Sequence, residues 1–191
     1  MKGRGGALAG IALFEWRHAV RRPVFAAAAL GFAALGALLS LNGPGSGPDL
    51  RNGPYAIAYS AGFLGLVSVF AATLLSAPAL LRDVEHRSAE IVFATPVSKR
   101  DYLFGRFAGS FLAVAAALAL GVAGLAAGGL LLRPDPAAAA RLDPLHFLEA
   151  YAVLALPGAL FSAALLFAVA ALARSTAATY AAGVTLYVLY W

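Results

Sequence analysis

The chain has 191 residues, of which 62% are hydrophobic and only 12% are charged, and its mean hydropathy is +0.82. This composition excludes an ordinary soluble domain, in which about 25% of the residues are charged. The net charge of +5 could indicate a nucleic-acid partner, but the basic residues stand at the ends of long apolar runs, where they would meet lipid headgroups instead. The absence of cysteine excludes disulfides and thiolate metal sites.

The first 22 residues are expected to comprise a short cytoplasmic start, residues 1–6, and an interfacial amphipathic helix from Ala7 to Arg22 that lies on the membrane surface. At about 100° per residue, the polar side chains fall on one arc: Glu15, Arg17, His18, Arg21 and Arg22. The opposite arc is apolar: Ala12, Leu13, Trp16, Ala19 and Val20. Trp16 would then lie at headgroup depth, with the arginines near anionic lipid. A cleaved signal peptide fits less well, because Glu15 and Trp16 stand where small residues should mark the cleavage site.

Five apolar runs follow, and they predict an all-α, polytopic bundle of transmembrane helices over residues 23–191. About 20 residues are needed to cross the hydrocarbon core, and the predicted spans are 24–41, 55–81, 102–132, 145–173 and 177–191. Pro78 and Pro157 predict kinks in the second and fourth spans. The fifth run is incomplete, with 15 residues and no flanking charge, so we expect the domain to continue beyond Trp191.

The basic residues predict which ends of the spans are cytoplasmic, because Lys and Arg accumulate on that side. Three of the 14 fall on one side of the predicted topology: Arg51, Arg133 and Arg141. Eleven fall on the other: Lys2, Arg4, Arg17, Arg21, Arg22, Arg82, Arg87, Lys99, Arg100, Arg106 and Arg174. The N-terminus and the stretch 82–106 are therefore expected in the cytoplasm.

The stretch 82–106 holds nine of the 23 charged residues. Asp83 and Arg87, four residues apart, favour a helix that continues out of the second span. Thr95-Pro96 would end it, and Ser98, three residues before Asp101, would cap the helix of the third span. The apolar Ile91, Val92 and Phe93 could pack on the protein's own helices, on lipid or in a groove of a partner.

The sequence contains no P-loop and no zinc-protease motif. The two lysines, Lys2 and Lys99, do not follow the glycines of a P-loop, and no HExxH is present. His146 and Glu149 have the spacing of a metal pair but are interpreted as interfacial residues beside a loop. No ionisable residue is placed at the centre of a span, which argues against an ion-coupled carrier. We expect no enzyme activity, no metal and no cofactor in this chain, so that a partner would supply the energy for any transport.

Small residues recur at the spacing that lets helices approach closely. The two GxxxG matches are Gly105–Gly109 and Gly124–Gly128. They indicate a packed bundle, and could also support a dimer.

Two passages, EWRHAVRRPVF and LLRDVEHRSAEIVFATPVSKRDYLFGRFAG, resemble the permease subunits of the type-two ABC exporter family. The resemblance implies six spans, a dimer in the cytoplasmic (inner) membrane, and an ATPase partner that binds ATP and Mg²⁺. It also implies that the interfacial helix and the loop after the second span meet that ATPase, with the loop as coupling helix. The docking positions would be Asp83, Glu85, Arg87, Glu90, Ile91, Val92 and Phe93, with Thr95 and Pro96 as the turn. The chain is similar, too, to the membrane half of longer proteins that carry a zinc aminopeptidase-like domain.

The sequence thus predicts a permease that couples ATP hydrolysis by a separate subunit to substrate movement. The alternative is a membrane anchor or scaffold, in a larger protein with a C-terminal soluble domain, that moves no substrate. The spans offer no distinctive polar pocket, so they do not indicate a substrate.

Overall fold

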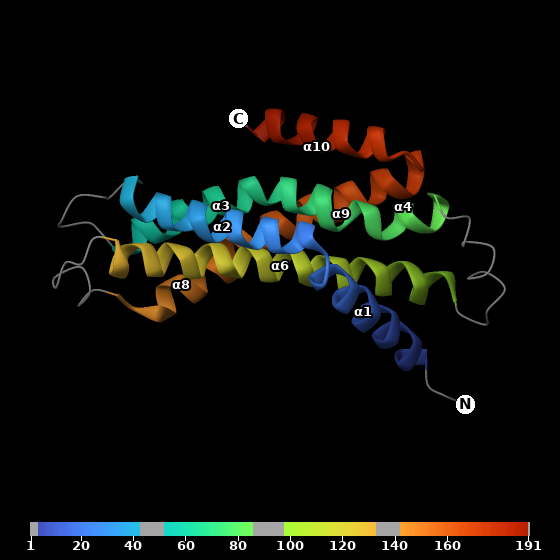
Figure 1. Cartoon of the computed structure of the whole chain (residues 1–191), viewed down its shortest axis with the longest axis horizontal. Helices are drawn as coiled ribbons and strands as arrows, with labels where there is room; N and C mark the ends of the chain where they lie inside the picture. Colours follow the sequence, from blue (N-terminus) through green and yellow to red (C-terminus); the bar gives the residue numbers. More distant parts are fainter. Residues whose placement is uncertain (1–3, 43–51, 86–97, 133–141, 191) are drawn as a thin grey trace. The chain divides into compact units, whose positions relative to one another are not determined.

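A computed structural model describes residues 4–42, 52–85, 98–132 and 142–190. These residues are almost all helical, with no strand among them (Figure 1). The predicted all-α helix bundle is confirmed. Four helical segments within the described ranges are long and apolar enough to cross a membrane: Pro23–Asn42, Pro54–Arg82, Lys99–Leu131 and Pro144–Ala173. Each coincides with one of the first four predicted spans.

The second segment is divided into two helices, α3 (Pro54–Leu75) and α4 (Ala77–Glu85). The sequence predicted a kink at Pro78, and the interruption falls two residues earlier, at Ser76. Pro78 has no N–H to donate to the preceding turn, and the Ala79 N–H bonds to the Ser76 carbonyl at 3.3 Å as α4 begins. The break leaves α4 as a short separate helix that carries Arg82.

The fourth segment contains a π-helical turn next to Pro157. It consists of α8 (Pro144–Ala150), the π turn Tyr151–Ala155 and α9 (Leu156–Ala173). The Leu156 N–H bonds to the Tyr151 carbonyl, five residues back. A proline ring clashes with the carbonyl four residues before it in a regular α-helix, and the wider π turn lies over that position. The helix continues through Pro157 by changing its winding.

The chain divides into two compact units. The second unit, residues 26–68 and 115–159, contains most of α2 (Pro23–Asn42), part of α3, the C-terminal half of α6 (Lys99–Leu131) and the start of the fourth segment. A Cβ atom at Gly128 of α6 would lie 2.7 Å from the Cα of Ala37, and one at Gly124 would clash with the Ala33 backbone. This GxxxG pair therefore brings α6 into direct backbone contact with α2 of the same chain.

The first unit comprises residues 1–25, 69–114 and 160–191. It contains α1 (Arg4–Val20), α4, the N-terminal half of α6, most of α9, and α10 (Thr176–Tyr190). Arg174 and Ser175 separate α9 from α10: Arg174 adopts a left-handed conformation, with φ of 48°, and the Ser175 hydroxyl accepts from the Ala178 N–H at 3.4 Å. This tight turn leads α9 into α10.

Candidate functional site

Helix α1 places a carboxylate in the interior of the first unit. The Glu15 side chain is 1% exposed, although Glu15 is the only acidic residue among the first 48. The predicted polar arc is right for Arg17 and Arg21, which are exposed, but wrong for Glu15. Helical periodicity placed Glu15 at the edge of that arc, and the edge is the side of α1 that packs against α6.

Two arginines from different helices bind this carboxylate. Arg82 Nη2, from α4, lies 2.8 Å from Glu15 Oε1, and Arg106 Nη1, from α6, lies 2.5 Å from Oε2. The guanidinium carbon of Arg106 also lies 5.4 Å from the ring centroid of Tyr102, a cation–π arrangement. Each carboxylate oxygen has its own charged donor, the condition under which a buried charge is tolerated. We refer to Glu15, Arg82 and Arg106 as the Glu15 clamp.

Glycines on α6 let α1 come close enough for the clamp to form. A Cβ atom at Gly105 would lie 2.9 Å from the Ile11 side chain, and one at Gly109 would clash with the carbonyl of Ala12 and lie 2.7 Å from Glu15 Cβ. The predicted close-contact motif Gly105–Gly109 therefore serves packing inside this chain. It holds the carboxylate next to Arg106.

The clamp binds both ends of the charged stretch 82–106. Arg82 is its first residue and Arg106 its last, and both pair with the same side chain of α1. Sequence reasoning missed this site, because it looked for function in the middle of the stretch. A signal was present in the lone acidic residue of an otherwise basic helix.

The structure describes only two of the nine predicted docking residues, and of these only the backbone. Asp83 and Glu85 lie in α4, without described side chains. The remaining seven lie outside the described residues: Arg87, Glu90, Ile91, Val92, Phe93, Thr95 and Pro96. Their docking role stays a prediction. The predicted cap just after them is confirmed, since the Asp101 N–H donates to the Ser98 hydroxyl at 3.0 Å.

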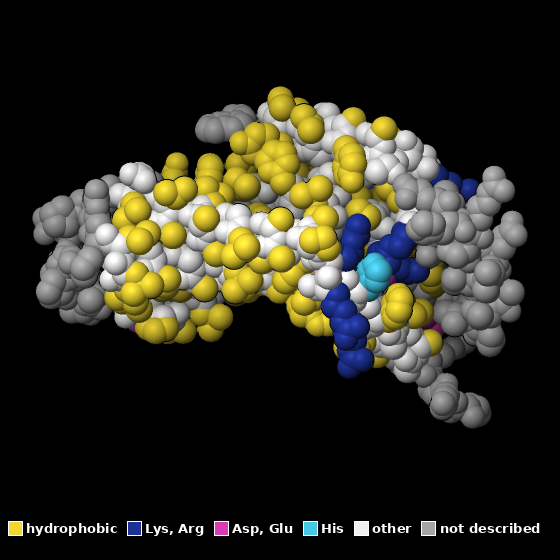
Figure 2. All heavy atoms as spheres, in the orientation of Figure 1, with side chains coloured by type: hydrophobic (Ala, Val, Ile, Leu, Met, Phe, Trp, Pro, Cys, Tyr) yellow, Lys and Arg dark blue, Asp and Glu magenta, His cyan; other side chains and the backbone are white. Residues whose placement is uncertain are grey.

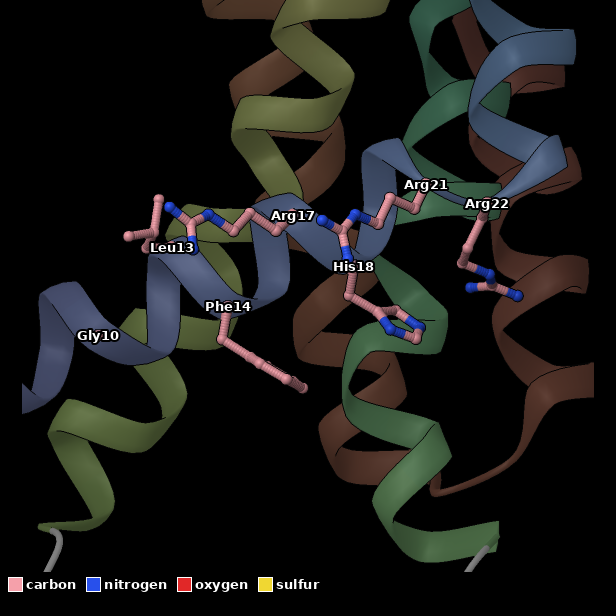
Figure 3. Close-up of a pocket in the computed structure, with 7 residues that line it drawn as sticks. All are labelled: Gly10, Leu13, Phe14, Arg17, His18, Arg21 and Arg22. Carbon is pink, nitrogen blue, oxygen red and sulfur yellow. The ribbon is translucent and has the colours of Figure 1, made fainter.

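The exposed side of α1 carries basic and aromatic side chains around a groove (Figure 3). The groove has a volume of about 450 Å³ and is lined by Gly10, Leu13, Phe14, Arg17, His18, Arg21 and Arg22. The rings of Phe14 and His18 stack with centroids 6.2 Å apart. Figure 2 shows Lys and Arg side chains gathered around the His at this place. Of the predicted interfacial residues, Trp16 is half-buried on α1.

The surroundings of His18 disfavour its protonated form. Burial lowers the pKa of His18 below 6.5; the charge of Arg82 lowers it further, Glu15 opposes the shift, and Arg22 and Arg106 add to it. Burial and the nearby arginines therefore both favour the neutral imidazole, and Glu15 offsets only part of their effect.

The pKa of His18 has a consequence for stability. Because the folded pKa is below the unfolded value of about 6.5, the unfolded state binds more protons between these two pH values, and stability falls as pH falls through that window. The His18→Gln variant should lose less stability on acidification from pH 7 to 5, measured by unfolding in detergent, than the wild type. His146→Gln, which removes a histidine from α8, should retain the loss. An unchanged loss in His18→Gln would contradict this account.

No metal centre is assembled by the described residues, which contain no group of three or more His, Asp or Glu side chains with suitable geometry. His146 Nδ1 lies 4.0 Å from Oδ2 of Asp143. Asp143 in turn caps α8, since its Oδ1 accepts from the Leu145 N–H at 2.9 Å. This local pair belongs to the start of a helix.

Comparison with known families shows which family the chain belongs to. A family model described as "ABC-2 family transporter protein" matches residues 10–191. The chain belongs to the ABC-2 transporter family. This ABC-2 protein is thus a multi-pass membrane protein and a permease component of an ABC transporter, and the resemblance seen in its sequence is confirmed. A search of the curated proteins finds no match.

Proposed function

We propose that this ABC-2 permease couples ATP hydrolysis by a separate ATPase subunit to the export of a substrate, and that it works as a dimer in the cytoplasmic membrane. ATP and Mg²⁺ would bind to the partner. The N-terminus and the stretch 82–106 would face the cytoplasm, in accordance with the eleven basic residues assigned to that side. The observation that carries the proposal is the Glu15 clamp, because it ties α1 to both ends of the stretch through which an ATPase would act.

The clamp connects both ends of the stretch 82–106 to helix α1. A force applied between residues 82 and 106 reaches α4 at one end and α6 at the other. Since Glu15 binds an arginine on each of these helices, a shift of either one is transmitted to α1 through short charge-assisted hydrogen bonds. The three helices would move together when ATPase subunits close, which would switch the spans between inward-facing and outward-facing states.

The first test is whether an ATPase accompanies the protein. Purification from native membranes in mild detergent should recover an ATP-binding subunit with the permease. If no such subunit is recovered, the proposal fails, and the anchor or scaffold role predicted as the alternative takes its place.

Charge reversal inside the stretch should uncouple the two proteins. In Arg87→Glu or Glu90→Lys, like charges would meet at the docking surface, so we expect stimulation of the partner's ATPase in liposomes to fall by about tenfold or more, while membrane insertion persists. Arg100→Glu is the matched control: it reverses a charge in the same stretch, on the exposed first turn of α6, but outside the predicted docking positions. Full stimulation by both stretch variants would show that these residues do not dock the ATPase.

A further inference from the structure

Beside the Glu15 clamp lies a second polar cavity, of about 300 Å³. Its polar lining comes from three places in the first unit: His18 on α1 and Arg22 just after it, Arg82 on α4, and Thr176 and Tyr180 on α10. Pro78 and Leu81 form its apolar wall. We refer to this cavity as the basic notch. Residues far apart in the sequence converge on it, so it is a product of the tertiary fold.

The notch has a positive charge that the described residues do not balance. None of its described lining side chains is acidic. The Glu15 carboxylate binds Arg82 through Oε1 and Arg106 through Oε2, so Arg82 shares this carboxylate with a second cation. Arg22 has no ion-pair partner among the residues that the structure describes. Burial lowers the pKa of His18, and the charges of Arg82 and Arg22, which line the same cavity, lower it further. The notch is therefore suited to an anion.

The position of the notch along the chain places it at the membrane surface. Arg22 directly precedes the candidate span Pro23–Asn42, Arg82 ends the span Pro54–Arg82, and Thr176 stands three residues after the end of Pro144–Ala173. Three span ends thus meet at one cavity. The end of a span lies at the boundary between hydrocarbon and headgroups, which is the depth of lipid phosphates.

Apolar surface continues from the notch. The groove of Figure 3 shares His18 and Arg22 with it and adds Leu13 and Phe14, which are 50% and 60% exposed. In Figure 3 the Phe14 and His18 side chains extend to the same side of α1. A free phosphate has no apolar part that could contact these side chains, whereas a lipid carries acyl chains next to its headgroup. This arrangement favours a lipid as the source of the anion.

We propose that the basic notch binds the phosphate group of an anionic lipid. The guanidinium groups of Arg22 and Arg82 donate to the phosphate oxygens, because planar guanidinium matches phosphate geometry. The Tyr180 hydroxyl is a further donor. Arg82 has donors to spare for this, since one of its nitrogens suffices for Glu15. The bound lipid would thereby contact α1, α4 and α10 and stabilise the end of the unit that carries the clamp.

Native mass spectrometry of the purified full chain tests the proposal. Phosphatidylglycerol and phosphatidylcholine with identical acyl chains are offered in separate titrations. We expect preferential binding of phosphatidylglycerol, and a loss of about tenfold in its apparent affinity in Arg22→Gln, the effect of one charge-assisted hydrogen bond. Tyr180→Phe should cost less. Arg100→Gln removes the same charge from the exposed start of α6, outside the notch, and should bind like the wild type.

Two further measurements test whether the anion lies next to His18 and whether the variant is still folded. NMR titration of His18 should show its pKa rising with phosphatidylglycerol and not with phosphatidylcholine, because a nearby anion favours the imidazolium. An unchanged thermal unfolding midpoint in Arg22→Gln excludes misfolding as the cause of lost binding. Equal binding of both lipids, or equal loss in Arg22→Gln and Arg100→Gln, would overturn the proposal. If inorganic phosphate alone displaced the lipid and raised the pKa to the same extent, a free anion would be the ligand and the lipid assignment would be wrong.

Discussion

Replacing Glu15 with alanine is expected to lower the free energy of unfolding by about 3–5 kcal/mol, the usual cost of removing one partner from a buried ion pair. The variant leaves Arg106, which is 7% exposed, without its carboxylate in the interior of the first unit. Arg82 is nearer to solvent and can turn toward water, so most of the loss should come from Arg106. Thermal or denaturant unfolding of the purified protein in detergent measures the change.

A double-mutant cycle assigns the loss to the pair. Arg106→Met replaces the buried charge with an apolar side chain, and the double variant Glu15→Ala with Arg106→Met should be more stable than the sum of the single losses implies, because the buried charge of Arg106 is removed together with the carboxylate that it binds. Glu149→Ala removes an exposed carboxylate from α8 and should cost less than about 1 kcal/mol. Strict additivity in the cycle, or a small loss in Glu15→Ala, would show that the clamp contributes little to stability.

The spans were predictable because hydropathy alone determines them. The first was predicted at 24–41 and runs Pro23–Asn42, and the third was predicted at 102–132 and runs Lys99–Leu131. A run of apolar residues bounded by charges has few alternatives, since only a helix satisfies its own backbone in lipid. The Ser98 cap was equally local, because the N-cap and the N–H that it binds are three residues apart.

Features that depend on tertiary contacts could not be predicted from the sequence. Glu15 has the periodicity of a surface residue, and its burial follows from the approach of α6, which one helix cannot reveal. Pro157 signalled an irregularity but not its form, because a kink and a π turn both relieve the same clash. Arg82 and Arg106 are 24 positions apart, and only the fold shows that they share a carboxylate.

Gly109→Leu is expected to displace α1 from α6 and to cost about 3 kcal/mol or more, toward the upper end of overpacking effects. The atoms that a side chain would meet include the backbone carbonyl of Ala12, which cannot rotate away as a side chain could. The same displacement would pull Glu15 from Arg106, so the steric and electrostatic losses should occur together. Trp16, on α1, reports the movement: in a Trp191→Phe background it is the single tryptophan of the chain, and its emission should shift.

Gly31→Leu provides the matched control, because it makes the same substitution in helix α2 at a glycine whose Cβ would have no atom within 4 Å. There the change should be neutral or slightly stabilising, since leucine is a better helix former than glycine by up to about 1 kcal/mol, and Trp16 emission should stay constant. If Gly109→Leu weakened the protein while Trp16 emission remained unchanged, α1 would have stayed in place and α6 would have yielded instead. If the losses in the free energy of unfolding caused by Gly109→Leu and Glu15→Ala simply added in the double variant, the helix contact and the ion pair would be independent of each other. Strong non-additivity is expected, because a helix that has already moved away has no clamp left to lose.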